Sequence, residues 1–504
     1  MRAFVKAVNA AMLATAIFTT AVLADPAEPP AQREAAPSKE DASRLLPADS
    51  VTHHSIETGG KKLDYTATAG TLPLYGPKGE AAAKVFYIAY TLDGAQGRPV
   101  TFAFNGGPGA ASAFLHLGAM GPRAINFNDN GSASSQPVRL SDNPDSWLDF
   151  TDLVFIDPVG TGFSRAPGGQ DAEKAFWSVE KDADALASIV RLYLTRNGRD
   201  LAPIFLTGES YGGFRVPHIA RRLLGTGMQV KGLILISPVL EFIMKEGDGF
   251  LLTPLVFDLP SITASHIEMT EGPNAGFDAV HEAERFARGD YLSQLAAGKG
   301  LDEAALRKLS QFTGLDPKII VRRNGRVSSS LFKSEYKRET DRSLSSYDGS
   351  ISAPRQRPSE SERFDLILDG AINVLAPAMT QYLRGDLGFA TDLQYRLLNP
   401  DVGANWDFGM RPGRQGFAGA LHELQRARTR YPALKVLIAH GYTDLVVPYA
   451  ASQFLVDQLN PIDTAAPIAV KVYKGGHMMY LRWVSRRALH ADAAELYKSA
   501  LVNP

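Results

Sequence analysis

The stretch Pro203-Ile-Phe-Leu-Thr-Gly-Glu-Ser-Tyr-Gly-Gly213 decides the fold. It opens with a short apolar run typical of a buried strand, and the chain beyond it has apolar residues three and four positions apart, which predicts a helix. Between them, residues 208–212 match the G-x-S-x-G pattern of a nucleophile elbow, a sharp strand-to-helix turn that holds a serine hydroxyl clear of a sheet. A plain glycine-rich turn would have the same pattern, but the strand before it and the helix after it favour Ser210 as a nucleophile.

Strands and helices alternate on both sides of this turn. Apolar patterns predict strands at residues 84–91, 100–105, 151–157, 230–236, 434–439 and 468–473, and helices at residues 179–194, 417–428 and 483–501. Such alternation is typical of a mostly parallel central sheet with helices on both faces. Together with the elbow it predicts the α/β class and, within it, an α/β-hydrolase fold.

The alternation stops after residue 240 and resumes near residue 376. Residues 241–375 contain helical patterns, including one that ends at Gly314, and a polar stretch over residues 333–363 that indicates a loop. We interpret this block as an inserted, mainly helical cap, so that residues 51–240 and 376–504 are the two parts of the hydrolase core. From its position, we expect the cap to cover the active-site mouth and to select the substrate.

The first 50 residues differ in composition from the rest of the chain. Arg2 and Lys6 precede an apolar run over residues 7–23, and small residues precede Asp25, which predicts a secretory signal peptide at residues 1–24. An uncleaved membrane anchor is the alternative, but the run is short and contains polar residues. Residues 25–50 are rich in Pro, Ala, Glu and Lys and are interpreted as a disordered tether. The protein is therefore predicted to be exported, to the periplasm or outside the cell.

The composition also excludes several classes of site and partner. The net charge is −1, from 53 Lys and Arg against 54 Asp and Glu, which gives no overall electrostatic basis for binding nucleic acid or an anionic membrane. There is no cysteine, which excludes disulfides, a zinc–thiolate site and a cysteine nucleophile. No later stretch is apolar enough to cross a bilayer, so no integral membrane span is expected after signal cleavage.

A nucleophilic serine needs a base and an acid that orients the base, in the chain order Ser, Asp or Glu, His for this fold. His477 follows a predicted strand in a glycine-rich loop at the carboxyl end of the sheet, where ligands gather. The other histidines far enough after Ser210 are His422, His440 and His490, which fall in predicted helices or close a strand. Asp444 follows the preceding strand, and its position favours it as the acid over a simple turn residue.

Acyl transfer also needs two backbone N–H groups directed at the developing negative charge. One is expected from Tyr211, directly after the nucleophile. The other is expected from the loop Asn105-Gly-Gly-Pro-Gly109, which follows an early strand, although a tight turn alone would explain that loop.

Several of these segments together resemble the serine carboxypeptidase family. The matching motifs are Asn105-Gly-Gly-Pro-Gly109, Asn143-Pro-Asp-Ser-Trp147, Asp157-Pro-Val-Gly-Thr-Gly-Phe-Ser164, Gly208-Glu-Ser-Tyr-Gly-Gly213, Gly441-Tyr-Thr-Asp444 and Gly476-His-Met478. The resemblance covers about residues 100–240 and 375–485. It also implies a helical cap where residues 241–375 lie.

The resemblance implies roles for individual residues. It implies Ser210, Asp444 and His477 as the triad, the N–H groups of Gly107 and Tyr211 as the oxyanion hole, and Asn105 with Glu209 as the groups that hold the substrate's terminal carboxylate. The chain departs from the family pattern at Ala110-Ala-Ser112, where relatives usually have Cys-Ser-Ser, and at Ala119, where relatives often have a second Glu. The second departure implies a smaller carboxylate-binding cluster.

The sequence therefore predicts a carboxypeptidase that acts on peptides with a free C-terminus and needs no metal or organic cofactor. An esterase or acyltransferase on the same scaffold would have the same triad and remains an alternative. A non-catalytic binding protein is a more distant alternative, because a pure binder has no need of Ser210, Asp444 and His477 together.

Overall fold

The computed structural model describes residues 42–134, 137–245, 251–354, 364–409 and 418–502. The predicted signal peptide and residues 25–41 of the predicted tether lie outside these ranges. The rest of the predicted tether is folded: residues 42–45 form a single helical turn, Leu46 is buried, and the Thr391 hydroxyl donates to the Leu45 carbonyl at 2.8 Å. The folded body thus begins earlier than predicted.

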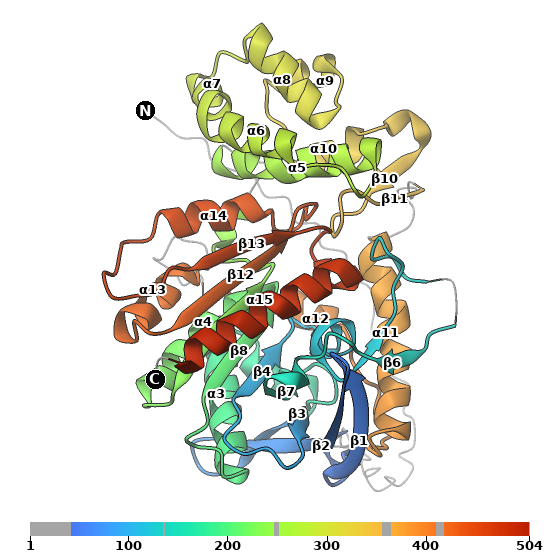
Figure 1. The fold of residues 1–504 in the computed structure, drawn as a ribbon, viewed down its shortest axis with the longest axis vertical. Helices are drawn as coiled ribbons and strands as arrows, with labels where there is room; N and C mark the ends of the chain where they lie inside the picture. The colour runs from blue at the N-terminus through green and yellow to red at the C-terminus, as the bar shows by residue number, and fades with distance from the viewer. Residues whose placement is uncertain (1–41, 135–136, 246–250, 355–363, 410–417, 503–504) are drawn as a thin grey trace, which may run out of the picture. The chain divides into compact units, whose positions relative to one another are not determined.

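One nine-stranded sheet has the strand order β1-β2-β3-β7-β4-β8-β9-β12-β13 (Figure 1). Its strands are β1 (Ser50–Thr58), β2 (Lys61–Tyr75), β3 (Ala81–Leu92), β4 (Val100–Phe104), β7 (Asp152–Ile156), β8 (Ile204–Glu209), β9 (Val230–Ile236), β12 (Lys435–Gly441) and β13 (Ala469–Tyr473). Strands β7, β4, β8, β9, β12 and β13 are parallel neighbours, and β1 to β3 add an antiparallel edge. The predicted strands are all present, and the sheet is mostly parallel, as expected.

Helices cover both faces of this sheet, which confirms the predicted α/β-hydrolase class. Successive strand residues point to opposite faces, so Phe205 packs in one apolar cluster and Leu206 in the other. Helices α3 (Val179–Arg196), α4 (Tyr211–Gly225) and α13 (Leu421–Arg430) pack on the Leu206 face. On the Phe205 face, α11 (Leu366–Gly385) and α15 (Trp483–Val502) pack, and Tyr497 of α15 stacks on Phe205 with 3.7 Å between ring centroids.

The helices of the block that we interpret as a cap share an apolar cluster of their own. They are α5 (Thr253–Glu271), α6 (Asp278–Phe286), α7 (Leu292–Ala297), α8 (Glu303–Thr313), α9 (Pro317–Arg322) and α10 (Ser329–Glu335), which Figure 1 draws as one group. Helix α8 ends at Gly314 in the left-handed conformation, as its sequence predicts. Helix α14 (Tyr449–Asp457), from the second part of the hydrolase core, contributes Tyr449 and Ala450 to the same apolar cluster.

The end of the cap block differs from the prediction. Helix α11 packs with the sheet and not with the cap helices. The polar stretch predicted as a loop contains α10 and a hairpin of β10 (Arg342–Leu344) and β11 (Ser352–Pro354), whose connecting turn buries Ser345 and Asp348. The loop prediction is wrong for these residues, because the polar side chains of the turn are satisfied by buried hydrogen bonds and an ion pair that composition does not reveal.

The described part of the chain also contains short helical turns and other short elements. Among the latter are α1 (Ala113–Leu115), α2 (Gln170–Glu173), α12 (Pro400–Ala404), and the paired strands β5 (Arg123–Ile125) and β6 (Leu140–Asp142).

Candidate active site

Ser210 lies at the sharp turn between β8 and α4. Its φ of 58° and ψ of −122° are rare for a residue with a side chain, and such strain is typical of a functional turn. The flanking glycines are needed for space: a Cβ on Gly208 would lie 2.1 Å from the Gly212 carbonyl oxygen, and a Cβ on Gly212 would lie 2.3 Å from the Phe104 carbonyl oxygen. The turn therefore has the form of a nucleophile elbow, and Ser210 lines a cavity of about 190 Å³.

His477 lines the same cavity, in the loop after β13. Its Nδ1 lies 2.8 Å from Oδ2 of Asp444, which is in the loop after β12. The other carboxylate oxygen of Asp444 accepts hydrogen bonds from the backbone N–H groups of Val446 and Val447, each at 2.8 Å. Both side chains are buried, so the structure brings the predicted base and acid together and fixes the carboxylate on both sides.

The electrostatic setting of His477 favours its charged form. Burial lowers the pKa of the imidazole, but the charge and hydrogen bond of Asp444, with a further contribution from Glu209, raise it, and the net direction is upward. An Asp–His pair of this kind fixes the tautomer in which Nε2 is free to accept a proton. Nε2 is the ring nitrogen that faces Glu209 Oε1, at 3.6 Å.

The other candidate histidines lie in different surroundings. His440 is buried in β12, where its Nε2 is 2.8 Å from the Ser452 hydroxyl and burial lowers its pKa to about 4. His490, in α15, contacts the carboxylate of Asp149 at 3.2 Å, and His422 is exposed on α13. Neither the hydrogen bond between His440 and Ser452 nor the contact between His490 and Asp149 involves Ser210 or Asp444.

The glycine-rich loop after β4 lies against the first residue of α4. A Cβ on Gly106 would lie 2.6 Å from the Tyr211 backbone nitrogen, and Gly107 and Tyr211 both line the cavity. The Tyr211 N–H belongs to the first turn of α4, where backbone N–H groups have no acceptor within the helix. The two residues expected to supply the oxyanion donors therefore line the same cavity.

Glu209 and Asn105 are in direct contact but are placed differently. Nδ2 of Asn105 donates to Oε2 of Glu209 at 2.9 Å, and Oδ1 of Asn105 accepts from the backbone N–H of Leu115 at 3.0 Å. Glu209 lines the cavity, whereas Asn105 is fully buried and is not among the lining residues. Burial raises the pKa of Glu209, against the opposing effects of His477 and Asn105. The chain has no second carboxyl group at Ala119, which is buried in a helical turn over residues 116–120.

The rest of the cavity lining is mostly apolar. It comprises Ala110, Phe114, Val239, Phe242, Leu368, Leu398, Val446 and Met478, together with Lys245 and Tyr347. Tyr347 comes from the turn between β10 and β11, a segment that sequence reasoning took for a loop. Its only sequence signal is an aromatic residue within a polar stretch, which is too weak to place it at a site.

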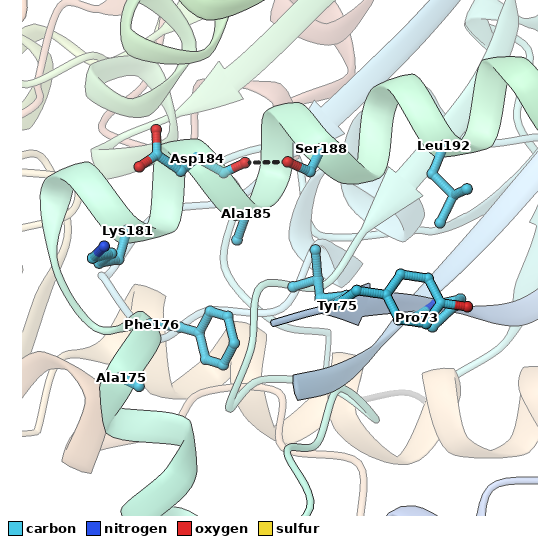
Figure 2. A pocket seen from close by; sticks show the side chains of 10 residues that line it. Pro73, Tyr75, Ala175, Phe176, Lys181, Asp184, Ala185, Ser188 and Leu192 are labelled. Atoms are coloured by element: carbon cyan, nitrogen blue, oxygen red, sulfur yellow. Dashed lines mark hydrogen bonds between the residues drawn. The ribbon is translucent and has the colours of Figure 1, made fainter. Parts of the chain in front are cut away.

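A second hollow of about 370 Å³ lies between the end of β2 and helix α3, and Figure 2 shows its lining. Its lining includes Phe176, Lys181 and Leu192, and no histidine is among the described residues around it. The Ser188 hydroxyl there donates to the Asp184 carbonyl within its own helix, at 2.8 Å. Among the described residues that line this hollow, no histidine is therefore present to activate Ser188.

Two searches of the described residues gave negative results. Within the ranges that the structure covers, no three His, Asp or Glu side chains are grouped so that they could hold a metal ion. No helix in those ranges is both long and apolar enough to cross a bilayer.

Comparisons with known proteins point to one family. Residues 68–241 match the family model described as serine carboxypeptidase. The chain is similar to serine carboxypeptidase-like 36 of Arabidopsis thaliana, at 28% identity over 173 residues, which are 33% of this chain and 33% of that protein. It is also similar to serine-type carboxypeptidase F of Aspergillus niger, at 28% identity over 190 residues, 35% of this chain and 32% of that protein. The chain thus spans about one third of the length of the curated relatives that it matches.

The fold is similar over a much longer stretch. The crystal structure of Kex1 from Saccharomyces cerevisiae, a prohormone-processing carboxypeptidase, matches with a TM-score of 0.51 at 17% identity, over 90% of this chain and 95% of that one. At this identity the match bears on the fold alone. The family match over residues 68–241 and this similarity of fold both point to serine carboxypeptidases as the proteins that the chain resembles.

Proposed function

We propose that the protein is a serine carboxypeptidase that releases C-terminal amino acids from peptides. The observation that carries this proposal is the arrangement of Ser210 at a strained elbow and His477, bonded to Asp444, around one cavity. The match of residues 68–241 to the serine carboxypeptidase family model supports the same reaction class. Peptides with a free C-terminus are the proposed substrates.

In the proposed reaction, the Ser210 hydroxyl attacks the last peptide carbonyl carbon while Nε2 of His477 takes its proton. The negative charge that develops on the carbonyl oxygen is stabilised by the N–H groups of Gly107 and Tyr211. His477 then gives its proton to the leaving amino acid, and Asp444 stabilises the imidazolium between these steps. Water repeats the attack on the acyl-enzyme and regenerates Ser210.

We assign the recognition of the terminal carboxylate to Glu209, with Asn105 as its support. A protonated Glu209 can donate a hydrogen bond to a carboxylate, and the upward pKa shift caused by burial favours that form. The hydrogen bond from the buried Asn105 supports Glu209 in this position.

The proposal is tested by product analysis on a mixed peptide library, with matched free acids, C-terminal amides and esters. We expect loss of single C-terminal residues from the free acids. Ser210→Ala and His477→Ala should each reduce turnover by many thousand-fold, whereas His490→Ala should retain it. Cleavage of esters without release of amino acids from peptides would favour the esterase or acyltransferase alternative. Failure of a fluorophosphonate probe to label Ser210 would favour a binding protein.

Export is a separate proposal, supported by the charged and apolar pattern of residues 1–24. Expression in the native cell should give a mature protein that begins at or near Asp25, in the periplasm or the medium. Mass spectrometry of the intact protein from each fraction would reveal an uncleaved N-terminus instead.

A further inference from the structure

The turn between β10 and β11, residues 345–351, which we call the strap, contacts the loop that carries His477. The Tyr347 carbonyl oxygen accepts the His477 backbone N–H at 2.6 Å, and the Tyr347 ring lies edge-on to the imidazole, with 5.2 Å between centroids and 90° between planes. The approach is so close that a Cβ on Gly476 would lie 1.9 Å from that carbonyl oxygen. The strap therefore fixes both the backbone and the ring of His477.

The same strap contacts the loop that carries Asp444. The Ser346 carbonyl oxygen accepts the Leu445 N–H at 3.1 Å, and the Gly349 N–H donates to the Thr443 carbonyl at 2.8 Å. The Thr443 hydroxyl donates to Oδ1 of Asp348 at 2.7 Å. These three bonds flank Asp444 on both sides in the chain.

An ion pair closes the arrangement. Oδ2 of Asp348 lies 2.6 Å from Nη2 of Arg482, five residues after His477, and the side chains of both are 5% exposed. Nη1 of Arg482 lies 2.6 Å from Oε1 of Glu268, which belongs to cap helix α5. One buried carboxylate, that of Asp348, thus bonds to the segments that follow both β12 and β13.

We infer that Asp348, Arg482 and Thr443 are positioning residues, which set the distance and angle between His477 and Asp444 through the strap. This inference rests on the proposed function, in which His477 is the base. The cap would then contribute to the reactivity of the site as well as to substrate selection. Asp444 raises the pKa of His477, so the strap also controls the pH at which the base becomes active.

Asp348→Asn tests the inference. The amide keeps an oxygen for the Thr443 hydroxyl and removes the charge that faces Arg482. We expect the rate of Ser210 labelling by a fluorophosphonate to fall at least about tenfold, and the acid limb of its pH profile to move to lower pH, because a looser contact with Asp444 raises the pKa of His477 less. With peptides, kcat should fall and KM should change little.

Other charged or titratable groups face His477 and must be kept constant in this experiment. They are Asp444, Glu209, Lys245 and His440, and the ring of Tyr347. The Asp348→Asn variant leaves all of them in place. Thr443→Val is the milder second variant, because it removes one hydrogen bond and keeps the ion pair, and it should shift the acid limb in the same direction by less.

Asp145→Asn is the matched control. Asp145 is 4% exposed and pairs with Arg486 at 3.3 Å, so it has similar burial and the same partner type but no contact with the strap. It should lower the Tm without moving the acid limb. If Asp348→Asn and Thr443→Val lower only the Tm, with labelling rate and pH profile unchanged, the strap is merely structural and the inference is wrong. Labelling uses no peptide, so it separates this failure from failure of the carboxypeptidase proposal, which the peptide library decides.

Discussion

Glu209 is the residue whose charge state links the site to pH. Burial raises its pKa, and only the protonated form can donate to a substrate carboxylate. As pH rises through that pKa, KM for free-acid peptides should rise, by at most about tenfold per pH unit, whereas KM for amides or esters should not. Glu209→Gln should flatten the dependence, since an amide donates at every pH.

Steady-state kinetics on a matched acid and amide peptide, from acid to neutral pH, would measure this difference. The amidated peptide serves as the control for any effect of Glu209 on the pKa of His477, because His477 lies 3.6 Å from Glu209 and takes part in the cleavage of both peptides. Parallel KM profiles for the two substrates would leave Glu209 as a structural support of the elbow.

Asp157 provides a second pH effect, on stability. It is buried after β7, and burial raises its pKa to about 7, against the hydrogen bond from the Ser112 N–H at 2.8 Å. The folded state therefore retains a proton that the unfolded state has released above pH 3.8, so this group makes the folded state less stable as pH rises from about 4 to about 7.

Asp157→Asn should remove that part of the pH dependence. Urea unfolding at about pH 4.5 and about pH 7.5 should show a smaller loss of stability in the variant, by up to a few kcal/mol, since one pKa unit corresponds to about 1.4 kcal/mol. All other titratable groups are common to both proteins. An equal loss in both would mean that Asp157 is ionised in the folded state.

At the residue scale, the sequence predicts catalytic residues well when their order along the chain, and the strands that they follow, determine where they lie. Ser210, Asp444 and His477 each follow a strand that has a strong apolar pattern, so their neighbourhood at one edge of the sheet could be predicted. Asn105 and Tyr347 could not be placed in this way. Whether Asn105 faces the cavity or lies behind Glu209 depends on side-chain packing, and the position of Tyr347 depends on hydrogen bonds between segments far apart in the chain.

At the scale of elements, the elbow joins β8, α4 and the end of β4 at backbone contact distance. Gly212→Ala should therefore destabilise the protein by about 1–3 kcal/mol through overpacking, because its Cβ would meet the Phe104 carbonyl oxygen at 2.3 Å. It should also slow the labelling of Ser210, since relief of the contact must move the elbow. Urea unfolding and probe labelling measure the two effects.

Gly225→Ala in the last turn of the same helix is the control. No atom lies within 4 Å of its would-be Cβ, so the change should be neutral or stabilising by up to about 1 kcal/mol. Similar losses in both variants would contradict the prediction, because Gly225 makes no contact with β4 and the loss could not then be assigned to that contact.

The predicted strands and helices of the core could be identified because each strand has a continuous or alternating apolar run and each helix has apolar residues three and four positions apart. Helix α8 of the cap block, with its closing glycine, could be predicted for the same reason. The end of the cap block could not be predicted in this way. Helix α11 is as apolar as a cap helix, and its sequence does not say which of two apolar clusters it joins. The strap has no apolar period at all, because an ion pair and backbone hydrogen bonds hold it.

At the scale of the whole molecule, the cap and the hydrolase core share apolar residues. Leu445, one residue after Asp444, and Tyr449 and Ala450 of α14 pack in the cluster that the cap helices form. The strap adds hydrogen bonds from the cap block to the loops of Asp444 and His477. With no cysteine in the chain, no disulfide links the two parts, so apart from the backbone connections only non-covalent contacts hold them together. We therefore expect the cap and the active site to lose structure together.

Leu309→Ala tests this coupling from within the cap. Leu309 is fully buried in α8, so truncation should destabilise the protein by about 2–5 kcal/mol. If cap and core are coupled, the helical circular dichroism signal and the labelling of Ser210 should decline over the same temperature range in the wild type, and both should shift downward together in the variant. Leu201→Ala, at a site that is 86% exposed, should change the stability by no more than about 0.5 kcal/mol, so neither the helical signal nor the labelling should shift appreciably in temperature. If the site needs the strap, Ser210 cannot remain reactive once the cap helices that support the strap have unfolded. A variant that loses part of its helical signal while Ser210 is still labelled at the wild-type rate would therefore show that the cap unfolds independently.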